Sequence, residues 1–140
     1  MKRNSRLSLA LHALGHMSYR ANSAQTSATI AEHAGTNPVV VRRVLGRLRT
    51  AGLVESERGH SGGWRLRVDP NEITLADVYI ALDEKTIAPK PEATQSTCSL
   101  EHALGARVSK IMAEAEAHLI ERLSRTTIAE IQTVSSHPST

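Results

Sequence analysis

The sequence contains no phenylalanine, and only 2% of its 140 residues are aromatic. A core for this chain must therefore be built mainly from Leu, Val, Ile and Ala, a palette that suits packed helices. The one cysteine excludes an internal disulfide and an all-cysteine metal site within one chain. No apolar run approaches the roughly 20 residues that cross a bilayer, and charges and histidines interrupt the start, MKRNSRLSLALHALGHM, where a signal peptide needs an apolar stretch. We expect a cytoplasmic protein without membrane contact.

The charge is divided unevenly along the chain, although the formal net charge is only +3. Residues 1–70 carry 11 Lys and Arg against 4 Asp and Glu, a net charge of +7, whereas residues 71–140 carry 6 against 10, a net charge of −4. This asymmetry indicates that the first half meets a polyanion, and the alternative is a merely uneven scatter of surface charge.

Three helices are predicted in the first half. Apolar residues spaced by three and four predict a helix over about residues 4–19. Ser27 is the predicted cap of a second helix that Gly35 ends. A third helix is predicted from Pro38 to Ala51 in spite of three consecutive valines, because Asn37 is a good N-cap and Gly52 a good C-cap. A short turn with a glycine between the last two is the layout of a helix-turn-helix.

A β-hairpin is predicted directly after the third helix. LVESE and WRLRV alternate as strands do, and RGHSGG between them supplies glycines that can reverse the chain. A helix-turn-helix followed by such a hairpin is a winged helix. The single Trp64 is expected to pack this wing onto the helices rather than to stack on a base, since duplex DNA offers no free base faces.

The second half is predicted to be helical and to hold two chains together. A fourth helix begins at the capping box Thr74 and Asp77, and residues 83–98 form a linker. From Ser99 an apolar stripe predicts a helix of about 25 residues, more apolar face than one protomer covers, so we expect a homodimer. The fold class is therefore mainly α with a small β-hairpin wing: a winged helix-turn-helix DNA-binding domain (residues 1–82), then a dimerisation helix and a short terminal helix (99–134), and a flexible tail (135–140).

The chain resembles the Rrf-two family of bacterial winged-helix transcriptional regulators. The similarity is carried by TIAEHAG, VLGRLRTAGLV, SERGHSGGWRL and DPNEITLADVYIAL, and it runs from about residue 7 to residue 131. The resemblance implies a dimeric repressor with no catalytic task. Members that hold an iron–sulfur cluster carry three cysteines after the fourth helix, whereas this segment has only Cys98. The sequence is thus most similar to the subgroup without a cluster, and no cofactor is expected.

Double-stranded DNA is the expected partner, read as a roughly palindromic operator with the third helix in the major groove and the wing at residues 57–66 in the minor groove. Arginine most often reads guanine, and an exposed valine can touch a thymine methyl. Val41, Val44, Leu45 and Leu48 are expected in the core instead. The candidate DNA-binding residues are Thr36, Asn37, Pro38, Val39, Val40, Arg42 and Arg43 at the start of the helix, Arg47 as a phosphate contact, and Arg58 and His60 at the wing tip.

Two alternatives to a DNA-binding regulator remain open from the sequence. The winged helix could be a protein-interaction scaffold without specific DNA binding, or the same chassis could sense a small ligand or an oxidant. Cys98 is the candidate sensor, since it lies just before a predicted helix whose dipole favours a thiolate, and a small structural residue is the alternative. His12 and His16 lie four apart on one helix face and are interpreted as a solvated pair rather than as metal ligands.

Overall fold

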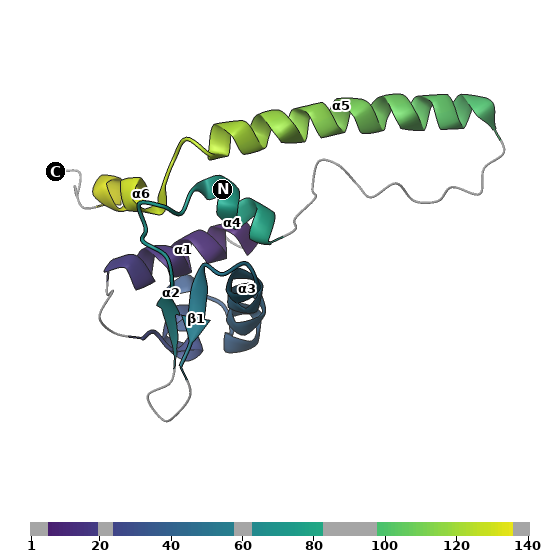
Figure 1. Cartoon of the computed structure of the whole chain (residues 1–140). Coiled ribbons are helices and arrows are strands. Elements are labelled where there is room, and N and C mark those ends of the chain that lie inside the picture. The colour runs from purple at the N-terminus through teal and green to yellow at the C-terminus, as the bar shows by residue number, and fades with distance from the viewer. Residues whose placement is uncertain (1–5, 20–23, 58–62, 83–97, 136–140) are drawn as a thin grey trace.

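The structure is a computed structural model that describes residues 6–19, 24–57, 63–82 and 98–135 (Figure 1). It is mainly helical with one two-stranded hairpin, as predicted. The elements in chain order are α1 (Arg6–Tyr19), α2 (Ser27–Ala34), α3 (Pro38–Thr50), β1 (Val54–Ser56), β2 (Trp64–Leu66), α4 (Leu75–Ala81), α5 (Ser99–Leu123) and α6 (Ile128–Ser135).

Local capping explains where the helices of the helix-turn-helix begin. The prediction that Ser27 caps α2 is wrong by one residue: the Thr26 hydroxyl accepts the hydrogen bond from the Thr29 N–H at 3.1 Å, and Ser27 is already helical. Asn37 caps α3 as predicted, since its side-chain oxygen accepts from the Val40 N–H at 3.1 Å. The short turn between α2 and α3 contains Gly35, which takes the left-handed conformation with φ of 69°. The capping box of Thr74 and Asp77 at α4 is also confirmed.

The core lies where α1, α2, α3 and α4 meet. The valine and leucine face of α3 is fully buried in it, as predicted for Val41, Val44, Leu45 and Leu48. The chain also returns from far along the sequence, because Ile128 at the start of α6 is buried in the same cluster. Thr127 pairs with Thr74 in an isolated β-bridge, and the Ile128 N–H donates to the Ile73 carbonyl at 2.9 Å. The last helix is thereby attached to the winged-helix part.

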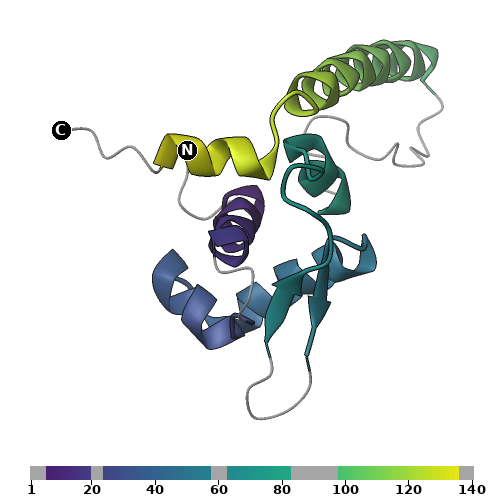
Figure 2. The same ribbon diagram turned by 60° about the vertical axis from the view of Figure 1, so that its left-hand side comes forward.

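The hairpin is antiparallel and lies on the same core. Val54, Glu55 and Ser56 pair with Leu66, Arg65 and Trp64, and Gln25 forms a bridge to the other side of Trp64. Figures 1 and 2 show the hairpin pointing away from the side of the molecule on which α5 lies. The wing is therefore presented opposite to the long helix.

The helix α5 is unlike the other helices because none of its residues is buried. It contacts α4, where the Tyr79 hydroxyl donates to a Glu116 carboxylate oxygen at 3.4 Å, and otherwise runs outward past the winged-helix part (Figure 1). None of the described helices combines the length and the apolar character needed to cross a membrane.

Candidate nucleic-acid interface

The outward face of α3 carries the candidate base-reading residues. Successive helical residues are about 100° apart, so Val39, Arg43 and Thr50 lie on the side of the helix opposite the buried Val41, Leu45 and Leu48. Val39 is 55% exposed, and Arg43 is exposed as well. An apolar side chain and a guanidinium thus project together from the first two turns of the helix.

The two flanks of α3 differ in what their arginines contact. Arg42 and Arg49 lie on the flank toward the wing, where one Arg49 nitrogen donates to the Ser56 hydroxyl at 3.2 Å and its guanidinium carbon lies 6.0 Å from the centre of the Trp64 ring. On the other flank, Arg47 donates to the Leu82 carbonyl at the end of α4, at 3.0 Å. Arg47 therefore joins α3 to α4 in this structure, a contact that its place in the sequence did not indicate.

The residues at the N-terminal end of α3 have structural tasks of their own. The side-chain oxygen of Asn37 is occupied as the cap, and Pro38 stands at the first helical position, where no N–H is needed. Thr36 and Val40 are half-buried. The partial positive charge at this end of the helix favours an approaching phosphate.

Trp64 holds the wing against the helix-turn-helix, as predicted. Its indole N–H donates to the Ser27 hydroxyl of α2 at 2.9 Å, and its ring packs against the core. The neighbouring Gly63 passes close to the backbone of Gln25: a Cβ built on Gly63 would lie 2.7 Å from the Gln25 carbonyl oxygen. Arg58 and His60, the predicted minor-groove residues, lie outside the described residues, so their contacts stay a prediction.

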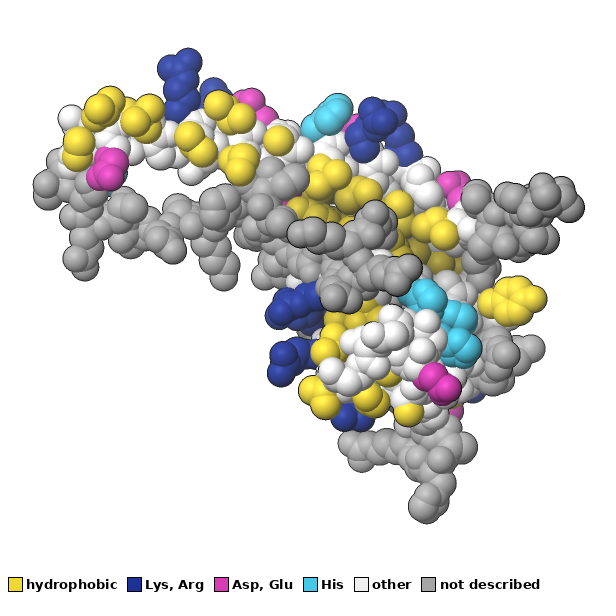
Figure 3. Space-filling model, turned by 180° about the vertical axis from the view of Figure 1, so that it is seen from behind, with side chains coloured by type: hydrophobic (Ala, Val, Ile, Leu, Met, Phe, Trp, Pro, Cys, Tyr) yellow, Lys and Arg dark blue, Asp and Glu magenta, His cyan; other side chains and the backbone are white. Residues whose placement is uncertain are grey.

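Three histidines cluster beside the candidate interface, and the sequence indicated only two of them as a pair. His12 and His16 of α1 place their Nε2 atoms 3.0 Å apart, and the ring of His33 from α2 stacks on His16 with ring centres 5.0 Å apart. Figure 3 shows histidine side chains gathered on one face of the winged-helix part. Sequence spacing pairs His12 with His16 but carries no signal for His33, which only the packing of α2 on α1 brings in.

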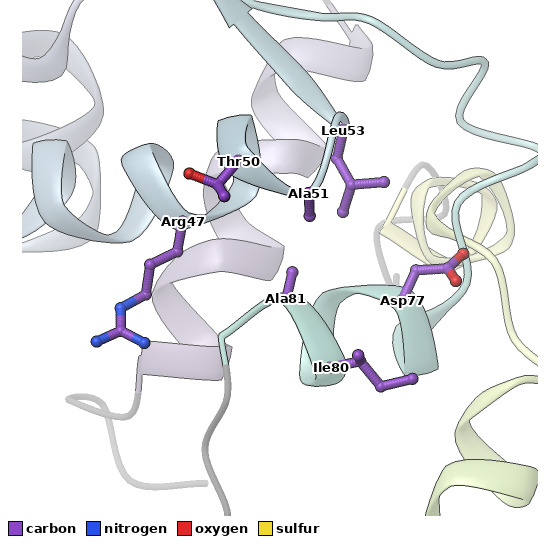
Figure 4. Close-up of a pocket in the computed structure, with 7 residues that line it drawn as sticks. All are labelled: Arg47, Thr50, Ala51, Leu53, Asp77, Ile80 and Ala81. Atoms are coloured by element: carbon purple, nitrogen blue, oxygen red, sulfur yellow. The ribbon is translucent and has the colours of Figure 1, made fainter.

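Hollows adjoin α3 on more than one side, and two of them are the larger ones among the described residues. One, of about 680 Å³, lies between α1 and the start of α3 and is lined by Arg6, Ser8, Leu9, His12, His33, Ala34, Gly35, Thr36, Asn37 and Val40. The other, of about 490 Å³, lies between the end of α3 and α4, where Arg47, Leu53, Asp77 and Ile80 surround it (Figure 4). Both are open rather than enclosed and neither involves Cys98, which is exposed at the start of α5.

Residues 3–133 match the model of the Rrf2 (Rrf-two) family, described as an iron-dependent transcriptional regulator. The chain belongs to the Rrf2 family. The family is one of transcriptional regulators, which are not enzymes. The exposed face of α3 is where a winged helix-turn-helix presents its second helix to DNA.

Individual Rrf2-type proteins resemble particular parts of the chain. It is 39% identical over 82 residues to the HTH-type transcriptional regulator YwnA of Bacillus subtilis, a match that covers 59% of each protein. It is 43% identical over 63 residues to the regulator IscR of Photobacterium profundum, covering 45% of this chain and 37% of that protein. The matches thus span less than two thirds of these relatives' own lengths. A crystal structure of a transcriptional regulator from Lactobacillus plantarum, 22% identical, shares the fold with a TM-score of 0.76 over 94% of this chain and 90% of that one.

The iron in the Rrf2 family description does not fit the residues of this chain. An iron–sulfur cluster needs several cysteine ligands, whereas Cys98 is the single cysteine of the sequence. Within the described residues, no three His, Cys, Asp or Glu side chains form a group that could hold a metal ion. The cluster that some members carry therefore has no set of ligands here.

Proposed function

We propose that this protein is a dimeric, sequence-specific repressor that works without a metal cluster in the cytoplasm and binds a roughly palindromic operator. The observation that carries the proposal is the outward face of α3, where Val39 and Arg43 project from a helix whose opposite face is buried in the core. A helix held so firmly on one side can present the other to base edges without losing its geometry.

Base reading is assigned to Arg43 and Val39, and phosphate contact to Arg42. Arg43 lies opposite the core and can pair with the O6 and N7 atoms of guanine, while Val39 can contact a thymine methyl beside it. Arg42 is turned by about 100° toward the wing, where the DNA backbone would pass between α3 and the hairpin. Thr36, Asn37, Pro38 and Val40 would place the positive end of α3 near a phosphate. Arg47 would contact a phosphate of the DNA backbone either beside its hydrogen bond to the Leu82 carbonyl or in place of that bond.

The wing would enter the minor groove next to the recognition helix. Trp64 and its bond to Ser27 hold β2 against α2, and Arg58 and His60, between the two strands in the sequence, are the residues proposed to contact the groove. Arginine in a narrow minor groove is favoured by the concentrated negative potential of A·T-rich DNA. The wing would thus add a preference for groove width to the bases read by α3.

The dimer would form through α5. Leu100, Leu104, Val108 and Ile111 follow one another at helical spacing and are 53–65% exposed, and Figure 3 shows hydrophobic side chains spread along this helix. A second copy of α5 would cover the stripe on both chains at once. Two α3 helices related by a twofold axis would then read two half-sites about one or a few helical turns apart.

Selection of bound fragments from a pool of random duplex DNA tests this function. We expect an enriched sequence with twofold symmetry, and an affinity for random duplex that falls steeply between low and moderate salt because bound counterions are released. A pool that stays random after repeated selection, or binding indifferent to salt, would contradict the proposal and favour a protein-interaction scaffold.

A further inference from the structure

The histidine cluster, defined as His12, His16 and His33, joins α1 to the end of α2. The Nε2 atoms of His12 and His16 are 3.0 Å apart, a hydrogen bond that needs one N–H donor and one bare acceptor nitrogen. The rings of His12 and His16 have centres 4.5 Å apart, and those of His16 and His33 have centres 5.0 Å apart. This hydrogen bond is lost when both rings of the pair are protonated, because neither then offers an acceptor nitrogen.

The described residues that line the hollow beside the cluster carry positive charge. Arg6 lines the same hollow as His12 and His33, and no carboxylate is among the described residues that line it. Arg43 and Arg47 of α3 line the neighbouring hollow together with Arg6. The acidic side chains on the helices packed against α1 are Glu32 of α2, which is exposed, Asp77 of α4 and Glu130 of α6, and the last two bond to their own helix starts.

The cluster is placed where a small shift would reach the recognition helix. His12 and His33 share their hollow with Thr36, Asn37 and Val40, the turn and first residues of α3. The α2 helix ends one residue after His33, and α3 begins four residues later, at Pro38. Pushing α2 away from α1 would therefore tilt the start of α3 relative to the core.

Partial burial, and then the nearby His33, lower the pKa of His12 below its ordinary value of 6.5. The unfolded chain then binds this proton more readily than the folded chain, so acid favours unfolding. The stability that comes from neutral His12 is fully present above pH 6.5 and is lost as the pH falls below 6.5 and through the lowered pKa.

We propose that the histidine cluster is an acid-sensitive joint: mild acidification charges it, loosens the packing of α2 on α1, and thereby weakens sequence-specific DNA binding. The effect on DNA rests on the function proposed above, whereas the effect on stability does not. Protonation of clustered histidines near pH 5 to 6 is a general means of switching a packed interface.

Thermal unfolding of the full chain at pH 7.5 and pH 5.5 tests the joint without DNA. We expect the wild type to lose several degrees more of its Tm on acidification than His12→Gln or His33→Gln. His118→Gln is the matched control, because it removes an exposed histidine on α5, away from the cluster, and should keep the wild-type loss. Equal losses in all four proteins would overturn the proposal.

An NMR titration of the imidazoles in the wild type and in His33→Gln gives a second readout, independent of thermal unfolding. His12 should titrate below 6.5, and its titration should move toward 6.5 in His33→Gln because a neighbouring positive charge is gone. A His12 resonance that titrates at or above 6.5 in the wild type would also overturn the proposal.

The DNA part is measured as the ratio of affinities for the selected duplex and for random duplex, at pH 7.5 and at pH 5.5. We expect this ratio to fall several-fold for the wild type and His118→Gln, and less for His33→Gln. A ratio near one already at pH 7.5 would refute the proposed function while the melting data still decide the joint. A high ratio that is unchanged at pH 5.5 would refute the joint and leave the function standing.

Discussion

At the scale of single residues, the direction in which a side chain leaves α3 is the basis of the role proposed for it. Arg42 and Arg43 are neighbours in the sequence and chemically identical, yet only Arg43 lies opposite the buried Val41 and Leu45. A base-reading arginine must reach the floor of the groove, whereas one on the flank meets the wall formed by phosphates. The helix geometry therefore places the two residues differently, and the different roles proposed for them follow from that placement.

Arg43→Ala should weaken binding to the selected operator by about 1–3 kcal/mol and leave binding to random duplex almost unchanged, because a bidentate contact to guanine is lost. Arg42→Ala is the matched comparison and should weaken both alike, with a shallower salt dependence. Fluorescence anisotropy with the two duplexes at several salt concentrations measures this. Equal losses on both duplexes for Arg43→Ala would make it a phosphate contact.

Residue-level contacts across elements are also where prediction from the sequence stopped. The core face of α3 and the packing role of Trp64 could be predicted, because periodicity and the chemistry of a lone indole are local signals. The bond from Arg47 to the Leu82 carbonyl and the stack of His33 on His16 could not, since each depends on how two helices cross. Each contact engages a side chain, that of Arg47 or of His33, for which the sequence indicated no partner within the protein.

At the scale of elements, the wing is held by a close passage of two backbones. The Gln25 N–H donates to the Trp64 carbonyl at 2.9 Å, and the Trp64 N–H donates back to the Gln25 carbonyl at 2.7 Å. Gly63 passes so near the same carbonyl that there is no space for a side chain. Among the described glycines, Gly63 does not have a positive φ. Its lack of a side chain instead lets the wing pass close to Gln25, just before α2.

Gly63→Ala should destabilise the fold by about 1–3 kcal/mol, since its Cβ would displace backbone rather than a flexible side chain. Gly46→Ala is the control: nothing lies within 4 Å of a Cβ there, and alanine in a helix interior should raise stability by about 0.5–1 kcal/mol. Chemical denaturation without DNA gives both values. A neutral Gly63→Ala would show that the wing tolerates a shift away from Gln25.

Element boundaries show why the sequence predicts helices better than their caps. Thr26 and Ser27 are adjacent hydroxyl residues that could each cap α2, and propensity alone does not separate them. The fold does, because Ser27 instead accepts the bond from Trp64 while Thr26 receives the Thr29 N–H. The helix α5 was predicted with its observed start because its long periodic pattern leaves no such ambiguity.

At the scale of the whole molecule, the surface proposed to contact DNA and the helix proposed to form the dimer lie on opposite sides. The wing points away from α5 in both ribbon views (Figures 1 and 2), and α6, which follows the C-terminal end of α5, is attached to the core through Ile128. Pairing through α5 would therefore set the spacing of two reading surfaces without covering either. The attachment through α6 matters for this proposal, because a dimer helix joined only by flexible segments would not fix the distance between the two α3 helices.

Leu104→Glu should convert the dimer into a monomer with an intact winged-helix fold, because a charge in the centre of the α5 stripe cannot be buried against a second copy without a partner. Leu104 is 56% exposed and does not belong to the buried core cluster of the described residues, so folding should survive. Operator affinity should then fall far more than the loss of one α3 contact would cause, because the second half-site no longer binds in the same complex. Ser109→Glu adds the same charge on the opposite face of α5 and should keep both dimer and affinity. Sedimentation velocity and operator titration measure the two effects, and a dimeric Leu104→Glu protein would show that the chains pair through another surface.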